Sequence, residues 1–316
     1  MLLSVLAFCT ALLLSYLTIP SIIRLAQARD WLERPGHRKS HTDLIPALGG
    51  IGIFAGLVMA LVLWMPDADY PDTRYFFASL LIIFMIGVKD DLYPLSPGKK
   101  LLGQILASGL LVFGTGAVIP SFFGIFGWYE LPDWFSYPFS LFTMLVIINA
   151  FNLIDGINGL SGSIGTLVSL FFGFFFLLTE HPFYAVTSFS LAGALIAFLW
   201  FNLRNRIFMG DTGALLIGLI VGLLTAQFLK MHHLESFYLK YPDLAFEAVP
   251  AVAIGLLMLP LFDTFRVFVL RILRGQSPLS PDRSHIHHLL LDYGLSHGQA
   301  TFTLVAVNAG FLLFVI

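Results

Sequence analysis

The sequence NAFNLIDGINGL, residues 149–160, joins two long apolar runs. Its asparagines, its aspartate and its two glycines are unfavourable inside a lipid-embedded helix, because every polar group there needs an internal partner. Such a cluster is more favourable at a helix end in contact with water, where Gly156 and Gly159 let the backbone approach a ligand closely. We therefore expect two membrane helices to meet at this stretch, with a binding site beside it.

The composition is that of an integral membrane protein. Apolar residues make up 58% of the 316 residues, charged residues make up 11%, and the mean hydropathy is +0.87. Apolar runs of about 18–20 residues, enough to cross ~30 Å of hydrocarbon, recur along the chain. The 17 basic and 19 acidic residues provide no positive field suited to nucleic acid. The single cysteine, Cys9, excludes disulfides and Cys-based zinc sites.

Ten apolar segments predict an all-α, polytopic membrane protein with about 10–11 transmembrane helices, forming a single transmembrane domain over residues 1–316. They lie at about 1–23, 46–65, 74–88, 99–118, 135–149, 160–179, 184–201, 214–230, 246–270 and 299–316. The first segment has no basic residue before it and no small-residue cleavage site, so we expect a membrane span and not a signal peptide. The chain stops within the tenth segment, which leaves open whether the C-terminus is native or shortened.

The basic residues are concentrated on one side of the predicted membrane. If the loop after the first segment is cytoplasmic, all but three of the 17 Lys and Arg residues fall in cytoplasmic loops. Because positively charged loops stay on the cytoplasmic side, we expect the N-terminus to lie outside. The unusual polar clusters then share the cytoplasmic face, where we expect the active site. They are Lys39 with His41, Asp90 with Asp91 and Lys100, and residues 149–158, 202–211 and 282–288.

Carboxylates in these clusters suit a divalent cation. Asp90 and Asp91 are adjacent, so each carboxylate disfavours ionisation of the other unless a cation is near. Such a pair is suited to binding a divalent ion or to abstracting a proton. Asp211 lies between glycines at the start of an apolar segment. Asp211, Asn152 and the Asp90/Asp91 pair would form the oxygen-rich set that Mg²⁺ prefers beside phosphates. A solvated helix cap is the alternative for each carboxylate.

Histidines and an arginine cluster near the C-terminal end of the chain. Arg283, His285, His287 and His288 would form a cationic pocket for phosphate. A solvated loop is one alternative, and a zinc site is a weaker one because the sequence offers no cysteine partner. Asp263 lies within the ninth apolar segment and needs a partner there, for which Arg266 at i+3 is the candidate.

Five motifs follow one another along nearly the whole chain. They are His41 with PALGG (46–50), DDLY (90–93) with KLLGQ (100–104), NAFNLIDGINGL (149–160), NRIFMGDTG (205–213) and PDRSHIHH (281–288). Each motif is weak alone. Together and in this order they resemble the polyprenyl-phosphate N-acetylhexosamine-1-phosphate transferases, a superfamily of the glycosyltransferase 4 type, and most of all its bacterial undecaprenyl-phosphate GlcNAc-1-phosphate transferases.

The resemblance implies a reaction that depends on Mg²⁺, or on Mn²⁺ in its place. The phosphate of undecaprenyl phosphate attacks the β-phosphorus of a UDP-N-acetylhexosamine, which releases UMP and starts a lipid-linked envelope glycan such as O-antigen or teichoic acid. The resemblance implies that the partners are these two substrates and the bilayer of the bacterial cytoplasmic membrane. It leaves open whether the protein forms a homodimer. Phosphoryl transfer of this kind relies on charge neutralisation and positioning more than on covalent help.

The resemblance also implies roles for individual residues. Asp211 and Asn152 would hold the metal. The catalytic set would be Asp90, which deprotonates or positions the lipid phosphate, with Asp91, Lys100, His287 and His288. The substrate-binding set would be His41, Asp155, Asn158, Arg206, Arg283 and His285, of which Asp155 and Asn158 lie near the uridine.

Two departures from the family pattern bear on the substrate. Asn158 stands where many bacterial members have Asp and where the eukaryotic members also have Asn. The histidine motif reads His-x-His-His, unlike the three consecutive histidines of the peptidoglycan enzyme. We therefore expect UDP-GlcNAc to be the donor substrate, with UDP-N-acetylmuramoyl-pentapeptide as the alternative. A membrane transporter or an intramembrane aspartyl protease is the alternative of another class, although a transporter should place its polar groups near the midplane.

Overall fold

The structure is a computed structural model that describes residues 1–32, 44–66, 72–275 and 285–316, and within these ranges it forms helices and no strand. The helices are α1 (Leu2–Ala28), α2 (Gly49–Trp64), α3 (Thr73–Leu92), α4 (Pro97–Gly109), α5 (Asp133–Ile154), α6 (Leu160–Leu178), α7 (Pro182–Asn202), α8 (Gly210–His232), α9 (Glu235–Lys240), α10 (Val249–Leu256), α11 (Met258–Leu273), α12 (Ile286–Asp292) and α13 (His297–Val315). A π-helical turn, Leu110–Gly114, extends α4. The predicted all-α class is confirmed.

Each of the ten predicted apolar segments forms a helix or a pair of helices. Within the described ranges, six helices are long and apolar enough to cross a membrane: α1, α5, α6, α7, α8 and α13. The number becomes seven if α10 and α11 together form one broken crossing. It falls short of the 10–11 crossings expected because α2 has only 16 residues, α3 carries Lys89, Asp90 and Asp91 in its last turn, and α4 ends in the π turn.

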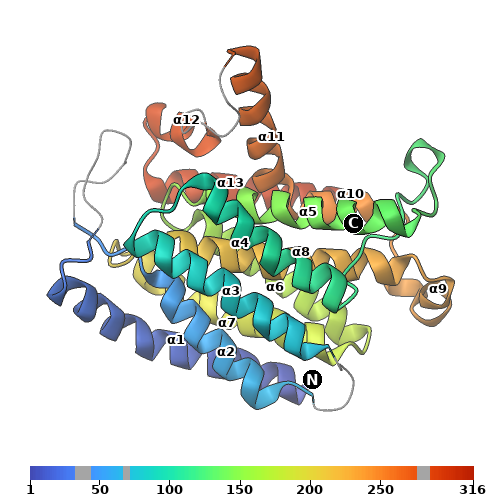
Figure 1. Cartoon of the computed structure of the whole chain (residues 1–316), viewed down its shortest axis with the longest axis horizontal. Coiled ribbons are helices and arrows are strands. Elements are labelled where there is room, and N and C mark those ends of the chain that lie inside the picture. The colour runs from blue at the N-terminus through green and yellow to red at the C-terminus, as the bar shows by residue number, and fades with distance from the viewer. Residues whose placement is uncertain (33–43, 67–71, 276–284) are drawn as a thin grey trace.

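Helix α8 lies at the centre of the bundle. Its sequence from Gly213 to Leu224 is apolar on all sides, and nearly every residue of the helix is buried. Helices α2, α3 and α5 pack directly against it. In Figure 1 the long helices lie side by side, while α11 leaves them at a steep angle. The start of α8 and the ends of α3 and α5 therefore meet at the same end of the bundle.

The ninth predicted segment is broken. The axes of α10 and α11 differ by 79° across a break at Leu257. Asn308 of α13 is fully buried against this break, where its Oδ1 accepts a hydrogen bond from the backbone N–H of Leu259 (2.9 Å) and its Nδ2 donates one to the carbonyl of Leu256 (3.0 Å). A helix break in apolar surroundings leaves backbone groups that require such partners. Asn308 therefore stabilises the bend that directs α11 away from the bundle.

Candidate functional site

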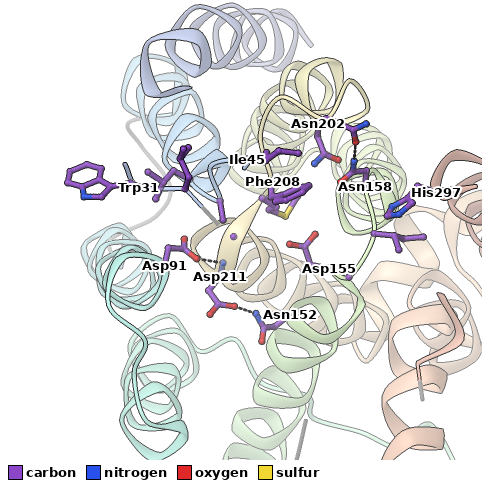
Figure 2. A pocket seen from close by; sticks show the side chains of 18 of the residues that line it. Trp31, Ile45, Asp91, Asn152, Asp155, Asn158, Asn202, Phe208, Asp211 and His297 are labelled. Carbon is purple, nitrogen blue, oxygen red and sulfur yellow. Dashed lines mark hydrogen bonds between the residues drawn. The ribbon is translucent and has the colours of Figure 1, made fainter. Parts of the chain in front are cut away.

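A polar cleft of about 1030 Å³ opens where α3 and α5 end and α8 begins. Its lining comes from the segments around residues 30, 47, 91, 155, 205 and 297, which lie far apart in the sequence. Figure 2 shows Asp91, Asp211 and Asn152 joined by hydrogen bonds on one side of this cleft, with Asp155 and Asn158 on another. For the polar clusters that fall within the described residues, the predicted convergence on one site agrees with this arrangement.

The predicted site residues divide into four groups. Seven line the cleft: Asp90, Asp91, Asn152, Asp155, Asn158, Asp211 and His288. Three do not line the cleft: Lys100 and His287 contact the lining residues Asn152 and His288, and His285 contacts His287. Arg206 is exposed to solvent and is not among the residues that line the cleft, and its contact with substrate stays a prediction. His41 and Arg283 lie outside the described residues.

Lys100 lies between the oxygen atoms of three predicted site residues. Its Nζ is 2.8 Å from Asp211 Oδ2, 3.0 Å from Asp90 Oδ2 and 3.4 Å from Asn152 Oδ1. Asn152 also donates a hydrogen bond from its Nδ2 to Asp211. The backbone N–H of Leu95 donates to the other oxygen of Asp90 at 2.6 Å, which fixes the orientation of that carboxylate. The site therefore gathers the ends of α3, α4, α5 and α8 around a single ammonium group.

Asp91 has a different set of contacts from its neighbour Asp90. Its Oδ1 accepts a hydrogen bond from the backbone N–H of Asp211 at 2.6 Å, and its Oδ2 accepts bonds from the N–H and the hydroxyl of Thr212. It therefore caps the N-terminus of α8, where a negative charge is favourable. Among the described residues the Asp211 side chain contacts Lys100 and Asn152, and the capping bonds to the first residues of α8 come from Asp91.

The close approach of α3 to α8 depends on a missing side chain. A Cβ atom built on Gly87, one turn before Asp91, would lie 2.4 Å from the Cα of Thr212. We expect Gly87→Ala to separate α3 from α8 and to lower the free energy of unfolding by about 1–3 kcal/mol. Thermal unfolding in detergent measures this loss. Gly310→Ala is the control, since a Cβ there meets nothing within 4 Å, and equal stability of the two variants would contradict the explanation.

A buried asparagine links the loop after α5 to the loop before α8. Asn202 accepts a hydrogen bond from the N–H of Gly159 at 2.6 Å and donates one to the carbonyl of Ile207 at 2.9 Å. Beside it, Asn158 donates to Asn205. Sequence reasoning gave no role to Asn202 or Asn205, although both line the cleft. Their position in the polar cluster 202–211 is the signal that points to them.

The three histidines occupy different environments. His285 is buried and its Nδ1 lies 2.8 Å from Asp263 Oδ2, and Asp263 also pairs with Arg266, as predicted (3.2 Å). His287 is only 2% exposed, and neither of its ring nitrogens has a hydrogen-bond partner among the described residues. His288 lines the cleft.

The environment of His287 bears on the cationic pocket expected from the sequence. Burial, together with the neighbouring His288 and His285, lowers the pKa of His287 to about 3. His287 is therefore neutral near pH 7, and its contribution to the pocket is a neutral ring instead of the positive charge expected from the sequence.

The donor set around Lys100 fits a magnesium ion that is shared with phosphates. In the described part of the chain, no three His, Cys, Asp or Glu side chains come together in a way that could hold a metal by themselves. Mg²⁺, however, commonly takes only one or two carboxylates from the protein and the rest of its ligands from phosphate oxygens and water. Asp211 and Asn152 provide such oxygens at the edge of the cleft, and a cationic group already lies against them.

Comparison with known proteins identifies the family. The model of glycosyl transferase family 4 matches residues 73–228, from the start of α3 to near the end of α8. The undecaprenyl-phosphate alpha-N-acetylglucosaminyl 1-phosphate transferase of Yersinia pestis is 30% identical over 287 residues, which cover 89% of this chain and 74% of that protein. The chain belongs to glycosyl transferase family 4. Family 4 membership argues against the transporter and the aspartyl protease that the residues alone left open.

Two further bacterial proteins show the same similarity over most of their length. A Bacillus subtilis protein described as a probable undecaprenyl-phosphate N-acetylglucosaminyl 1-phosphate transferase is 30% identical over 309 residues, covering 96% of this chain and 82% of that protein. The undecaprenyl-phosphate alpha-N-acetylglucosaminyl 1-phosphate transferase of Escherichia coli K12 is 30% identical over 299 residues, covering 92% and 76%. These relatives are bacterial, and the helices described here make this family 4 chain a multi-span membrane protein.

Proposed function

We propose that this protein transfers GlcNAc-1-phosphate from UDP-GlcNAc to undecaprenyl phosphate and releases UMP. The observation that carries the proposal is the junction of Lys100, Asp90, Asp211 and Asn152 at the edge of a polar cleft, in a chain whose relatives are named for this transfer. In the reaction, an oxygen of the lipid phosphate bonds to the β-phosphorus of the nucleotide sugar. The bond between that phosphorus and the bridging oxygen breaks, and the oxygen leaves with UMP.

Asp211 and Asn152 would hold Mg²⁺ against the diphosphate, and the ion would neutralise charge that builds up during transfer. Lys100 lies within hydrogen-bonding distance of both side chains, so it would keep the Asp211 carboxylate and the Asn152 amide oriented and add a positive charge beside the leaving phosphate. Asp90 is held by Leu95 and Lys100 on the side of the cleft where α3 ends, in a position suited to orient the acceptor phosphate or to take its proton.

The other end of the cleft would bind the nucleoside and the sugar. Asp155 and Asn158 line it beside Phe208, whose backbone is fixed by a hydrogen bond from its N–H to the carbonyl of Pro46 (2.8 Å). This combination of carboxylate, amide and aromatic groups suits a uracil ring and a ribose. His288 and the neutral His287 would face the N-acetyl sugar or the phosphate that is transferred.

We further propose that the cleft opens on the cytoplasmic side of the bacterial inner membrane, with the N-terminus outside. Arg24, Arg29, Lys89, Lys99 and Arg204 lie on helix ends or loops at the end of the bundle that contains the cleft, whereas Arg74 and Lys240 belong to the opposite end. This distribution follows the positive-inside bias.

The test is an assay of UMP release by purified protein in detergent with undecaprenyl phosphate and Mg²⁺. UDP-GlcNAc, UDP-GalNAc and UDP-N-acetylmuramoyl-pentapeptide are offered separately, and an EDTA-treated sample is the control. We expect UMP from UDP-GlcNAc and none after EDTA treatment. UMP from the pentapeptide substrate alone would overturn the choice of sugar, and release that persists in EDTA would overturn the metal requirement.

A further inference from the structure

Asp263 is a buried carboxylate that lies outside the cleft and still contacts the histidine motif. It lies early in α11, just after the bend, and is 1% exposed. Its Oδ2 is 2.8 Å from His285 Nδ1, and its Oδ1 accepts hydrogen bonds from the backbone N–H of Ile286 (2.9 Å) and from Arg266 (3.2 Å). Both oxygens are thus occupied, two of the three donors belong to the histidine segment, and Asp263 joins α11 to the start of α12.

The contacts continue from His285 to the lining of the cleft. The rings of His285 and His287 stack with centroids 5.6 Å apart and planes inclined by 10°. His287 in turn packs on Gly156, where a Cβ atom would lie 2.0 Å from its Nε2. Gly156 lines the cleft next to Asp155. Because His287 has no hydrogen-bond partner in the described part of the chain, its orientation depends on packing: on the ring of His285, on the ring of His288 (centroids 4.3 Å apart) and on Gly156.

A carboxylate beside Nδ1 also selects the tautomer of a histidine. Asp263 can only accept at Oδ2, so His285 must carry its proton on Nδ1. An asparagine has almost the same shape but would turn its NH₂ group toward Nδ1, since its oxygen is needed by Ile286 and Arg266. His285 would then have to carry its proton on Nε2. Replacing one atom at position 263 therefore changes how the ring is held without removing side-chain volume.

We infer that Asp263 is a positioning residue for sugar-1-phosphate transfer: it holds His285, and through the stacked rings it seats His287 over Gly156 at the edge of the cleft. The inference rests on the proposed function and extends it to a side chain that touches neither the cleft nor a substrate. Residues that orient a functional group from behind commonly change activity by about 10- to 100-fold when they are replaced.

The first readout is independent of activity. Diethyl pyrocarbonate modifies accessible neutral imidazoles, and peptide mass spectrometry reports the extent at each histidine. His285 and His287 are 4% and 2% exposed, so we expect both to be protected in the wild type and modified severalfold faster in Asp263→Asn. Thr264→Val is the matched control, because Thr264 is the next residue, is buried, and has a hydroxyl without a partner within the described ranges. Unchanged protection in Asp263→Asn would overturn the inference.

The second readout is UMP release. We expect Asp263→Asn to lower kcat by about 10- to 100-fold with a smaller change in KM, and Thr264→Val to match the wild type. If Asp263 acts through His287, the double variant Asp263→Asn/His287→Ala should be no slower than His287→Ala alone. If the loss of kcat in the double variant equalled the product of the losses in the two single variants, the inference would be overturned.

Gly156→Ala tests the position of the His287 ring from the side of the cleft, without changing Asp263. It replaces Asp263→Asn as the test if that variant is too unstable to purify. The added Cβ must displace the His287 ring, so we expect faster modification of His287 and a loss of kcat similar to that of His287→Ala. Wild-type kcat in Gly156→Ala would overturn the inference. A wild-type protein that releases no UMP from any donor contradicts the proposed function instead, and the labelling pattern still shows whether Asp263 holds the histidines.

Discussion

Replacing Asp211 by asparagine should lower sugar-1-phosphate transfer by about 10³-fold or more, the size of loss seen when a group that stabilises transition-state charge is removed. Asparagine keeps the shape and one oxygen of the side chain but removes the negative charge that Mg²⁺ would require. The fold should survive, because the carboxylate that caps α8 belongs to Asp91 and not to Asp211. The measurement is UMP release together with the thermal unfolding temperature of the same preparation.

A metal-binding readout makes this result specific. Mn²⁺ can replace Mg²⁺ in oxygen-ligand sites, and its electron paramagnetic resonance signal reports the free ion in the presence of the nucleotide sugar. We expect the wild type to bind Mn²⁺ and Asp211→Asn to bind it more weakly. Asp133→Asn, at the other end of the molecule where α5 begins, is the control for a lost carboxylate. Wild-type turnover by Asp211→Asn would show that the metal ligand is another residue.

The second large effect is expected for Lys100→Met. Methionine fills a similar volume but removes the ammonium group that lies 3.0 Å from Asp90 and 2.8 Å from Asp211. The two carboxylates, whose side chains are 8% and 30% exposed, would then face each other without a cation. We expect the free energy of unfolding in EDTA to fall by about 2–4 kcal/mol, because an ion pair that loses one partner leaves an uncompensated charge. Turnover should fall by about 10²-fold or more.

Magnesium should reverse part of this loss of stability. A divalent ion that binds the folded protein between the freed carboxylates adds to the free energy of unfolding in proportion to the logarithm of its concentration. Thermal unfolding of Lys100→Met with and without Mg²⁺ measures this effect. Lys99→Met is the matched control, since Lys99 is the preceding residue and is exposed. If Lys100→Met were as stable as Lys99→Met in EDTA, the ammonium would have no role in holding the carboxylates together.

The sequence was sufficient to predict the helices and the general position of the site. Long apolar runs leave little choice but helices in a membrane, and polar residues such as Asn152 and Asp211 stand at the ends of those runs. Because the ends fall on the same side when the runs alternate in direction, seven of the predicted residues line one cleft. The pairing of Asp263 with Arg266 was also predicted, since residues at i and i+3 of a helix are neighbours.

The contacts that were missed join residues far apart in the chain. Asp91 caps a helix 120 residues later, and the sequence alone presents it as a second copy of Asp90. Asn202 forms hydrogen bonds with two loops, and the His285 ring contacts a carboxylate 22 residues earlier in the chain. Hydropathy and motif spacing show where polar groups occur, but the identity of each hydrogen-bond partner depends on how the helices pack.

The bend at Leu257 imposes an order on how the protein is built. Ribosomes deliver the chain from its N-terminus, so α10 and α11 enter the membrane before Asn308, which follows Leu259 and Leu256 by 49 and 52 residues. Until α13 arrives, the carbonyl of Leu256 and the N–H of Leu259 lack their Asn308 partner. A continuous helix would not supply one for the Leu256 carbonyl, because the residue four positions later is Pro260, which has no N–H. We therefore expect the bend to reach its final, fully hydrogen-bonded geometry only when α13 packs against it, late in biogenesis.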